Sequence, residues 1–327
     1  MSQAIINDAL KNWVPYRLLM DNDATHCQWL NLKDKKITEP FFADTISVTR
    51  ENRSQRCVSD LAVLPEWAAS LPSVAPSAIV FHVSRCGSTL LSQVLSLNET
   101  NIVLSEVPFL DELLRLHYKQ PGADLNVIDE QLKAAVGLYG QQRTGNERHL
   151  FIKADCWHIF FYERLRALYP TVPFFLLYRE PVEVLQSQQK KKGMQAVPGV
   201  IEPQIMGLEF ADNDPMLFDH DLYFSTVLEK IMGEFLTVVE KDNNTYLLNY
   251  TEGAMQWLDK MASVGGFTIS EEWKEQVKDR ANFHGKYPGQ PFEKETHIES
   301  PDSLAKCNEY YTLLEAKRKR RDVLKAL

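Results

Sequence analysis

The sequence predicts an α/β protein in which a parallel sheet is flanked by helices in three layers. Two observations predict this fold. From Ser77 onward, short apolar runs typical of buried strands alternate with amphipathic, helix-like stretches. The first of these runs also leads through a short glycine turn directly into a helix-like stretch. Strands that alternate with helices form right-handed βαβ units, and these build a parallel sheet covered on both faces.

The segment before this alternation has a different character. Residues 1–70 are rich in tryptophan, proline and mixed charge and lack a strand-helix rhythm, so we expect an N-terminal appendage packed on the main domain. The stretch "SLPSVAPS" (70–77) is a proline and serine linker of the kind that precedes a first strand. The main domain is therefore predicted to span residues 71–327.

The individual elements follow from the pattern. The predicted strands cover residues 78–83, 101–106, 149–154, 172–178 and 245–250. The predicted helices cover residues 88–97, 108–118, 126–139, 157–168 and 221–240. Residues 191–217 break the rhythm with glycine and proline, and a long loop inside a compact domain is often a lid or faces substrate. The basic stretch "EAKRKRRDVLKAL" at the C-terminus is interpreted as a solvated helix face.

Composition limits the classes of function. A formal charge of -8 argues against a general nucleic-acid binder, because affinity for the phosphate backbone comes from clustered basic residues. The five cysteines are odd in number and widely spaced, with no metal-binding pattern. We find neither a signal peptide nor an apolar run of membrane-spanning length. The expectation is a soluble, cytoplasmic protein without nucleic-acid or membrane partners.

The turn in "FHVSRCGSTLLSQVL" (81–95) suits an anion. A turn between a buried strand and a helix directs backbone N–H groups and the positive end of the helix dipole at one point. Gly87 permits close approach, Ser88 and Thr89 add hydroxyls, and Arg85 offers a forked cation. The pattern is P-loop-like but lacks the lysine of GxxxxGK[ST], because Ser88 follows Gly87. An ordinary strand, turn and helix with a serine cap is the alternative.

Two motifs resemble the sulfotransferases that use 3′-phosphoadenosine 5′-phosphosulfate (PAPS). "SRCGSTLL" is similar to their 5′-phosphosulfate loop, which implies contacts from Arg85, Cys86, Gly87, Ser88 and Thr89. "VPFFLLYREPVEVLQSQ" (172–188) resembles their second signature, a strand followed by an arginine and, eight residues later, a serine. The resemblance covers about residues 77–290 and implies a P-loop nucleotide-binding fold.

The second signature assigns two residues to the donor. The resemblance places Arg179 and Ser187 at the 3′-phosphate. Pro181 would open the helix that carries Ser187. A plain ion pair of Arg179 with Glu180 or Glu183 is the alternative.

Sulfuryl transfer requires a base and a cation at the leaving oxygen. Glu106 follows a predicted strand and lies 21 residues after Arg85, the spacing of the catalytic glutamate in tyrosylprotein sulfotransferases. Lys153 ends another strand, and "IKAD" resembles that family's "NKD", whose lysine assists the leaving oxygen. Arg85 would share this catalytic role. A glutamate that only favours a helix dipole, and a lysine paired with Asp155 or another acid, are the alternatives.

Further assignments come from the same resemblance. His117 and His158 are alternative bases, because cytosolic small-molecule sulfotransferases use a histidine. Lys191, Tyr250 and Lys286 are predicted donor contacts, although "NFHGKYPG" (282–289) lacks the "RKG" of the cytosolic enzymes. A catalytic thiol at Cys86 is not expected, because no histidine partner is visible in the sequence.

The predicted function is transfer of a sulfuryl group from PAPS, as co-substrate and without a metal, to a hydroxyl or amine of a small-molecule or peptide acceptor. A P-loop small-molecule kinase and a catalytically inactive nucleotide-binding protein are the alternatives. Residues 107–147 and 191–220 are the expected acceptor loops. The sequence predicts neither the acceptor nor the oligomeric state.

Overall fold

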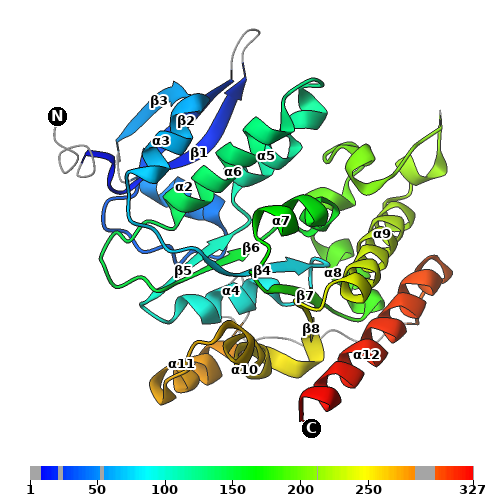
Figure 1. Cartoon of the computed structure of the whole chain (residues 1–327). Helices are drawn as coiled ribbons and strands as arrows, with labels where there is room; N and C mark the ends of the chain where they lie inside the picture. Colours follow the sequence, from blue (N-terminus) through cyan, green and yellow to red (C-terminus); the bar gives the residue numbers. More distant parts are fainter. Residues whose placement is uncertain (1–8, 21–24, 52–54, 212, 284–298, 327) are drawn as a thin grey trace. The chain divides into compact units, whose positions relative to one another are not determined.

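The computed structural model describes residues 9–20, 25–51, 55–211, 213–283 and 299–326 (Figure 1). These residues form two compact units. Unit 1 comprises the described parts of residues 1–79 and 92–154, and unit 2 those of residues 80–91 and 155–327. Strand β4 (Pro76–His82) and helix α4 (Ser88–Ser96) contribute residues to both units. The predicted domain boundary near residue 70 stays a prediction.

The predicted α/β fold with a parallel sheet is confirmed. The sheet has five strands in the order β5-β6-β4-β7-β8. Besides β4, these are β5 (Asn101–Ser105), β6 (His149–Lys153), β7 (Phe174–Tyr178) and β8 (Thr245–Asn249). In unit 1, β5 pairs with β6 in parallel, and in unit 2, β7 pairs with β8 in parallel. All five residues of β7 are buried, as expected for a strand covered on both faces.

Helices flank the sheet at the places where the sequence predicts them. Unit 1 contains α5 (Pro108–Lys119) and α6 (Leu125–Tyr139), and unit 2 contains α7 (Tyr162–Leu168), α8 (Pro181–Lys190) and α9 (His220–Lys241). Pro181 occupies the first turn of α8, as predicted. Unit 2 continues with α10 (Gly253–Gly265), α11 (Glu271–Ala281) and α12 (Ala305–Ala326). In Figure 1, α12 (red) runs alongside α9.

The N-terminal segment has regular structure that the sequence did not predict. Strands β1 (Trp13–Met20), β2 (Thr25–Asn31) and β3 (Arg56–Asp60) form an antiparallel sheet in that order. Helices α2 (Phe42–Glu51) and α3 (Leu64–Ala69) belong to the same unit. Pro15 faces Trp29 next to an irregularity in the β1-β2 register. A proline inside an apolar run argues against a strand, which is why the pattern concealed this sheet.

Two predicted segments differ in detail. The helix predicted over residues 157–168 is a 3-10 helix (Cys156–Phe161) followed by α7, and Asp155 and His158 form a capping box around its first turn. The predicted loop over residues 191–217 contains three short 3-10 helices, Met194–Ala196, Pro203–Met206 and Pro215–Leu217. No helix among the described residues is both long and apolar enough to cross a membrane.

The basic C-terminal run is more than a solvated helix face. Arg318 in α12 has only 13% of its side chain exposed and forms ion pairs with Glu315 and Glu252. Glu315 also accepts hydrogen bonds from Tyr178 Oη (2.6 Å) and Asn249 Nδ2 (2.8 Å). The carboxyl ends of β7 and β8 are thus tied to α12 by a buried polar network.

Candidate functional site

The predicted anion loop of unit 2 has the backbone of an anion-binding turn. Three of its residues lie in the left-handed region: Ser84 (φ 66°), Arg85 (φ 49°) and Gly87 (φ 85°). Such conformations are rare for residues with a Cβ and turn successive N–H groups toward one side of a loop. Helix α4 begins immediately afterwards at Ser88 and has no acidic residue in its first turn. The loop therefore presents a positive helix terminus to any ligand that it holds.

The loop is held against neighbouring elements of unit 2. Val83 N donates to Leu177 O (3.1 Å), and Cys86 Sγ donates to the same carbonyl (3.4 Å). Cys86 is fully buried, which gives it a structural role at the base of the loop. A Cβ added at Gly87 would lie 2.9 Å from the Trp257 ring and 3.0 Å from the Tyr250 ring. Glycine is therefore required there both for conformation and for space.

Arg179 lies next to this loop. Its Nη1 donates to Arg85 O (3.1 Å), and its Nε donates to Glu183 Oε2 (2.8 Å). The guanidinium carbon lies 4.3 Å from the centre of the Tyr250 ring. The parallel register explains this meeting, because Tyr178 pairs with Asn249 and the next residue of each strand is Arg179 and Tyr250. The predicted donor contacts Arg85, Gly87, Arg179 and Tyr250 are thus brought together.

Ser187 follows from the same geometry. The ion pair with Glu183 draws Arg179 to one face of α8, and Ser187 lies one turn further along that face. The ion pair between Arg179 and Glu183, which is the alternative interpretation of Arg179, is present. An anion at this point would meet an arginine already oriented by three groups.

Lys191 contacts the anion loop through its backbone carbonyl. The Arg85 guanidinium donates to Lys191 O, whereas the Lys191 side chain is exposed. Gln188 was not predicted as a site residue, but its buried amide donates to Ser84 Oγ (3.0 Å) and accepts from Gly193 N (2.7 Å). Gln188 thus ties the anion loop to the segment after α8. A single glutamine in a helix carries no signal for this role.

Unit 1 brings together the two residues predicted to act on the transferred group. Lys153 Nζ lies 2.8 Å from Glu106 Oε1, and Glu106 N donates to Lys153 O (2.9 Å). Ser105 pairs with Lys153 in the parallel register of β5 and β6, so Glu106 emerges beside it. Lys153 therefore pairs with an acid, as its alternative interpretation required, and that acid is the predicted base.

The surroundings of this pair are unusual. The Lys153 side chain is only 3% exposed, against 24% for Glu106. Its ammonium lies 4.8 Å from the centre of the Phe41 ring, which comes from the N-terminal segment. Glu106 has φ 51°, a strained conformation for a residue with a side chain. Strain of this kind is concentrated at functional sites, which favours a role beyond that of a helix-capping acid.

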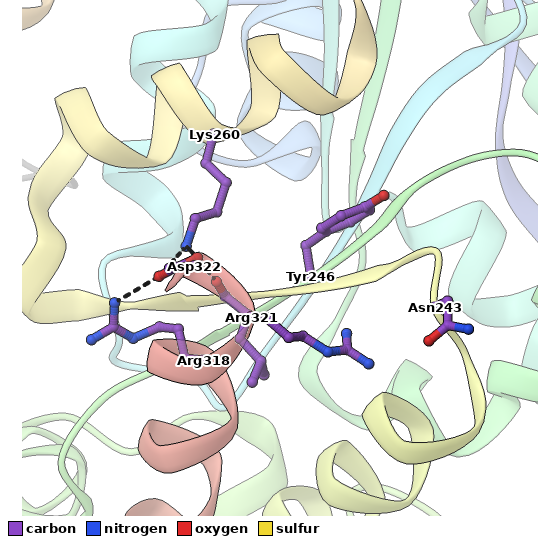
Figure 2. Close-up of a pocket in the computed structure, with 7 residues that line it drawn as sticks. Asn243, Tyr246, Lys260, Arg318, Arg321 and Asp322 are labelled. Atoms are coloured by element: carbon purple, nitrogen blue, oxygen red, sulfur yellow. Dashed lines mark hydrogen bonds and ion pairs between the residues drawn. The ribbon is translucent and has the colours of Figure 1, made fainter. Parts of the chain in front are cut away.

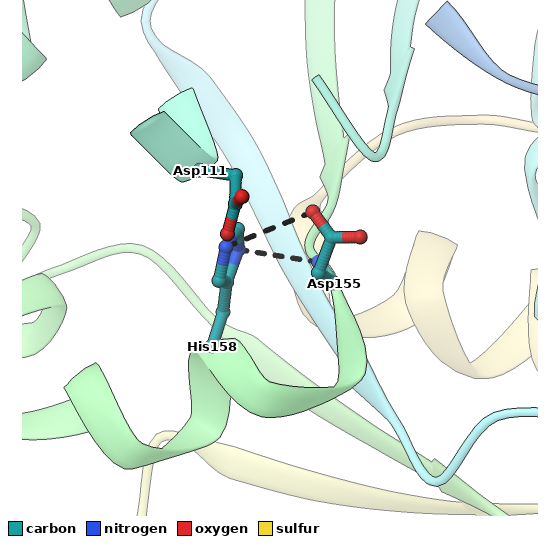
Figure 3. A group of neighbouring side chains, drawn as sticks. All are labelled: Asp111, Asp155 and His158. Atoms are coloured by element: carbon teal, nitrogen blue, oxygen red, sulfur yellow. Dashed lines mark hydrogen bonds and ion pairs between the residues drawn. The ribbon is translucent and has the colours of Figure 1, made fainter. Parts of the chain in front are cut away.

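The alternative bases have other surroundings. His158 is buried, its Nδ1 accepts from Asp155 N (3.2 Å) and its Nε2 lies 3.6 Å from Asp155 Oδ2 (Figure 3). These contacts make it part of the cap of the first 3-10 turn. His117 lies in the last turn of α5, about 14 Å along the helix from its start next to Glu106, at 1.5 Å per residue.

Lys286 lies outside the described residues.

Unit 2 contains a cavity of about 200 Å³ beside α12 (Figure 2). Its lining residues are Asn243, Tyr246, Leu247, Lys260, Arg318, Arg321 and Asp322. Lys260 and Arg318 both pair with Glu252 and Asp322, and Arg321 donates to the backbone carbonyls of Thr245 and Val239. None of the predicted site residues within the described ranges lines this cavity.

Comparisons with known proteins find likeness only among solved structures. No protein-family model and no curated protein matches the chain. The chain resembles a sulfotransferase from Mycobacterium tuberculosis H37Rv with 13% identity and a TM-score of 0.40, over 65% of this chain and 73% of that one. It resembles the sulfotransferase domain from the curacin biosynthetic pathway with 16% identity and a TM-score of 0.42, over 62% of this chain and 77% of that one. It resembles a sulfotransferase from Mycobacterium avium with 14% identity and a TM-score of 0.42, over 80% of this chain and 78% of that one. Likeness this distant carries no inference about the activity of this protein.

Proposed function

We propose that this protein is a sulfotransferase that moves a sulfuryl group from PAPS to a hydroxyl or amine acceptor by in-line displacement. The observation that carries the proposal is the contact of Arg179 with both the Arg85 carbonyl and the Tyr250 ring beside a left-handed, lysine-free anion loop. A triphosphate site of the NTPase type needs the lysine that Ser88 replaces. An arginine pair suits a donor that carries separate phosphate and phosphosulfate groups.

The roles of the residues follow from the bonds that change. A bond forms between the acceptor oxygen or nitrogen and sulfur, while the bond from sulfur to the bridging oxygen of the donor breaks. In this proposal Glu106 takes the acceptor proton. Lys153 and Arg85 stabilise the charge that develops on the departing phosphate of adenosine 3′,5′-bisphosphate. Arg179 and Ser187 bind the 3′-phosphate, and Ser88 and Thr89 bind the 5′-group. Lys191, Tyr250 and Lys286 remain proposed donor contacts.

Nucleotide binding gives the first test. The melting temperature of the protein should rise with saturating adenosine 3′,5′-bisphosphate or PAPS and not with ATP and Mg²⁺. A response to ATP and Mg²⁺ alone would instead support a kinase. No response to the bisphosphate or to PAPS would refute the proposal.

Transfer gives the second test. Labelled PAPS incubated with the protein and a cell extract should yield a labelled product that is absent without the protein, and its identification would reveal the acceptor. Tight binding of the bisphosphate without transfer to any acceptor would indicate a nucleotide-binding protein that lacks turnover. The acceptor class, small molecule or peptide, is part of what this experiment decides.

A further inference from the structure

Strand β3 lies at an outer position of the antiparallel sheet in unit 1. The strand order is β1-β2-β3, and within the described residues no strand pairs with the other side of β3. Four of its five residues are exposed, and Val58 at its centre has 57% of its surface exposed. An exposed edge of this kind is a template for pairing with another strand.

The register shows which backbone groups of β3 face outward. Asn31 N donates to Gln55 O (3.0 Å), and the register pairs Leu30 with Arg56 and Trp29 with Cys57. In an antiparallel ladder every second residue exchanges hydrogen bonds with the neighbouring strand. Residues 55, 57 and 59 therefore bond to β2. Arg56, Val58 and Asp60 direct their N–H and C=O groups away from β2, and Asp60 O already accepts from Ser59 Oγ (2.9 Å).

The side chains of this edge are self-complementary. Arg56 and Asp60 lie two residues on either side of Val58 and carry opposite charges. Neither residue forms an ion pair with the described residues of its own chain, and Asp60 Oδ1 accepts one hydrogen bond there, from Ala62 N (2.7 Å). If a second copy approaches antiparallel with Val58 opposite Val58, Arg56 of each copy lies opposite Asp60 of the other. The three outward-bonding residues also share one face of the strand, because side chains alternate.

We propose that β3 is a dimerisation edge, at which two copies of this chain join their three-stranded sheets into one six-stranded antiparallel sheet around a two-fold axis at Val58. Two features select this register: the alternation of outward-bonding and inward-bonding residues along β3, and the opposite charges of Arg56 and Asp60. A shift by one residue would place inward-bonded groups opposite outward ones, and a shift by two would place Arg56 opposite Val58. Two-fold pairing of identical surfaces is the commonest form of protein self-association. The proposal does not depend on the function proposed above.

The expected dimer is weak. A single pair of five-residue strands buries far less than the roughly 1,200 Å² of a standard stable interface. Association should therefore depend on protein concentration. The rival interpretation is that Arg56 and Asp60 are edge charges that prevent pairing, as in many natural sheets. That interpretation predicts a monomer at every concentration.

Cross-linking tests the register. In a Cys57→Ser background the four remaining cysteines are buried. Adding Val58→Cys places two thiols at a hydrogen-bonded pair with Cα atoms about 5.5 Å apart, within the range of a disulfide. Mild oxidation should then give a covalent dimer. The matched control is Arg56→Cys, whose thiols would lie about 14 Å apart, four residues along the strand, and should not cross-link. Equal cross-linking of both variants, or none with Val58→Cys, would overturn the proposal.

Sedimentation velocity over a wide concentration range tests the dimer itself. Val58→Pro removes an outward N–H and is tolerated on an edge strand, so it should abolish association without unfolding the chain. Val58→Thr keeps the donor and should still associate. Arg56→Glu replaces two attractive pairs by repulsive ones and should weaken the dimer about tenfold. A parent protein that is monomeric throughout, or a dimer that Val58→Pro leaves unchanged, would show that β3 is not the interface.

Discussion

Lys153 Nζ lies 2.8 Å from Glu106 Oε1, and each residue stands at the carboxyl end of one of two paired parallel strands. The sequence assigned these residues different tasks, a cation at the leaving oxygen and a base at the acceptor. Their contact makes the ammonium and the carboxylate an ion pair.

Replacing the base should separate chemistry from binding. Glu106→Gln keeps the shape of the side chain but cannot accept the acceptor proton, so turnover should fall by about 10²- to 10⁴-fold. The affinity for adenosine 3′,5′-bisphosphate, measured by calorimetry, should change little. Glu99→Gln is the control, because Glu99 is 85% exposed and pairs only at the surface with Lys36. An unchanged rate in Glu106→Gln would remove this residue from the mechanism.

The Phe41 ring should support catalysis through Lys153. Phe41→Leu keeps an apolar contact but loses the ring face, a cation–π interaction worth about 0.5–2 kcal/mol. Turnover should fall about 3- to 30-fold while the affinity for the nucleotide stays the same. Phe41→Tyr, which retains the ring, should recover most of the rate.

The adjacent residue provides the structural control. Phe42 is fully buried and packs edge-to-face on Tyr139, with ring centres 5.2 Å apart. Phe42→Leu should lower the melting temperature without a comparable loss of turnover at low temperature. If both variants lose turnover only in proportion to stability, the Phe41 ring has no specific effect on Lys153.

Gly87→Ala should damage nucleotide binding through a clash. The new methyl group would meet the Trp257 ring at 2.9 Å, and alanine at φ 85° is itself strained. We expect the dissociation constant for the bisphosphate to rise at least about tenfold, because the loop must shift away from the Trp257 and Tyr250 rings to relieve the clash. Gly145→Ala is a matched control, because Gly145 also has φ 85° but has nothing within 4 Å of its added Cβ. Equal effects of both variants on binding would argue against the clash.

Arg179 can be tested by ligands that differ only in the 3′-phosphate. Arg179→Ala should weaken binding of adenosine 3′,5′-bisphosphate by about 10²-fold, because the charge-assisted contact proposed for the 3′-phosphate is lost. Binding of adenosine 5′-monophosphate, which lacks that phosphate, should change much less. Arg166 is the control arginine, since it pairs with Asp242 and covers the Phe174 ring at 3.6 Å. Arg166→Lys should affect stability rather than nucleotide discrimination. If Arg179→Ala lowers the affinity for both nucleotides equally, Arg179 does not contact the 3′-phosphate.

The sequence predicted the parallel sheet and the order of its flanking helices because buried strands and amphipathic helices have distinct periods. Residues at the carboxyl ends of paired parallel strands are also predictable as neighbours. This pairing brings Glu106 beside Lys153 and Arg179 beside Tyr250. The antiparallel sheet was not predicted, because Pro15 interrupts β1 and because 24 residues (32–55) separate β3 from its partner strand β2. Trp257 and Gln188 were missed because their roles depend on tertiary contacts that no local pattern records.

The network around Glu315 should make stability fall in acid. Burial raises the pKa of this carboxyl group, but hydrogen bonds from Arg318, Tyr178 and Asn249 outweigh it and lower the pKa from 4.5 to about 2. A lowered folded-state pKa means that the unfolded chain takes up the proton first as pH falls. The stability contributed by Glu315 is therefore complete above about pH 4.5 and is lost as the pH approaches 2.

Denaturant unfolding between pH 2.5 and 7 measures this contribution. Glu315→Gln should lower the free energy of unfolding at pH 7, because it leaves the half-buried Arg318 with one carboxylate fewer. The variant should also show a shallower loss of stability below pH 4.5, because the group that titrates is gone. Glu275→Gln is the control, since Glu275 is 67% exposed and its ion pair among the described residues is with Lys278. A parent and a Glu315→Gln variant with the same acid slope would show that the carboxylate does not link α12 to the strand ends in this way.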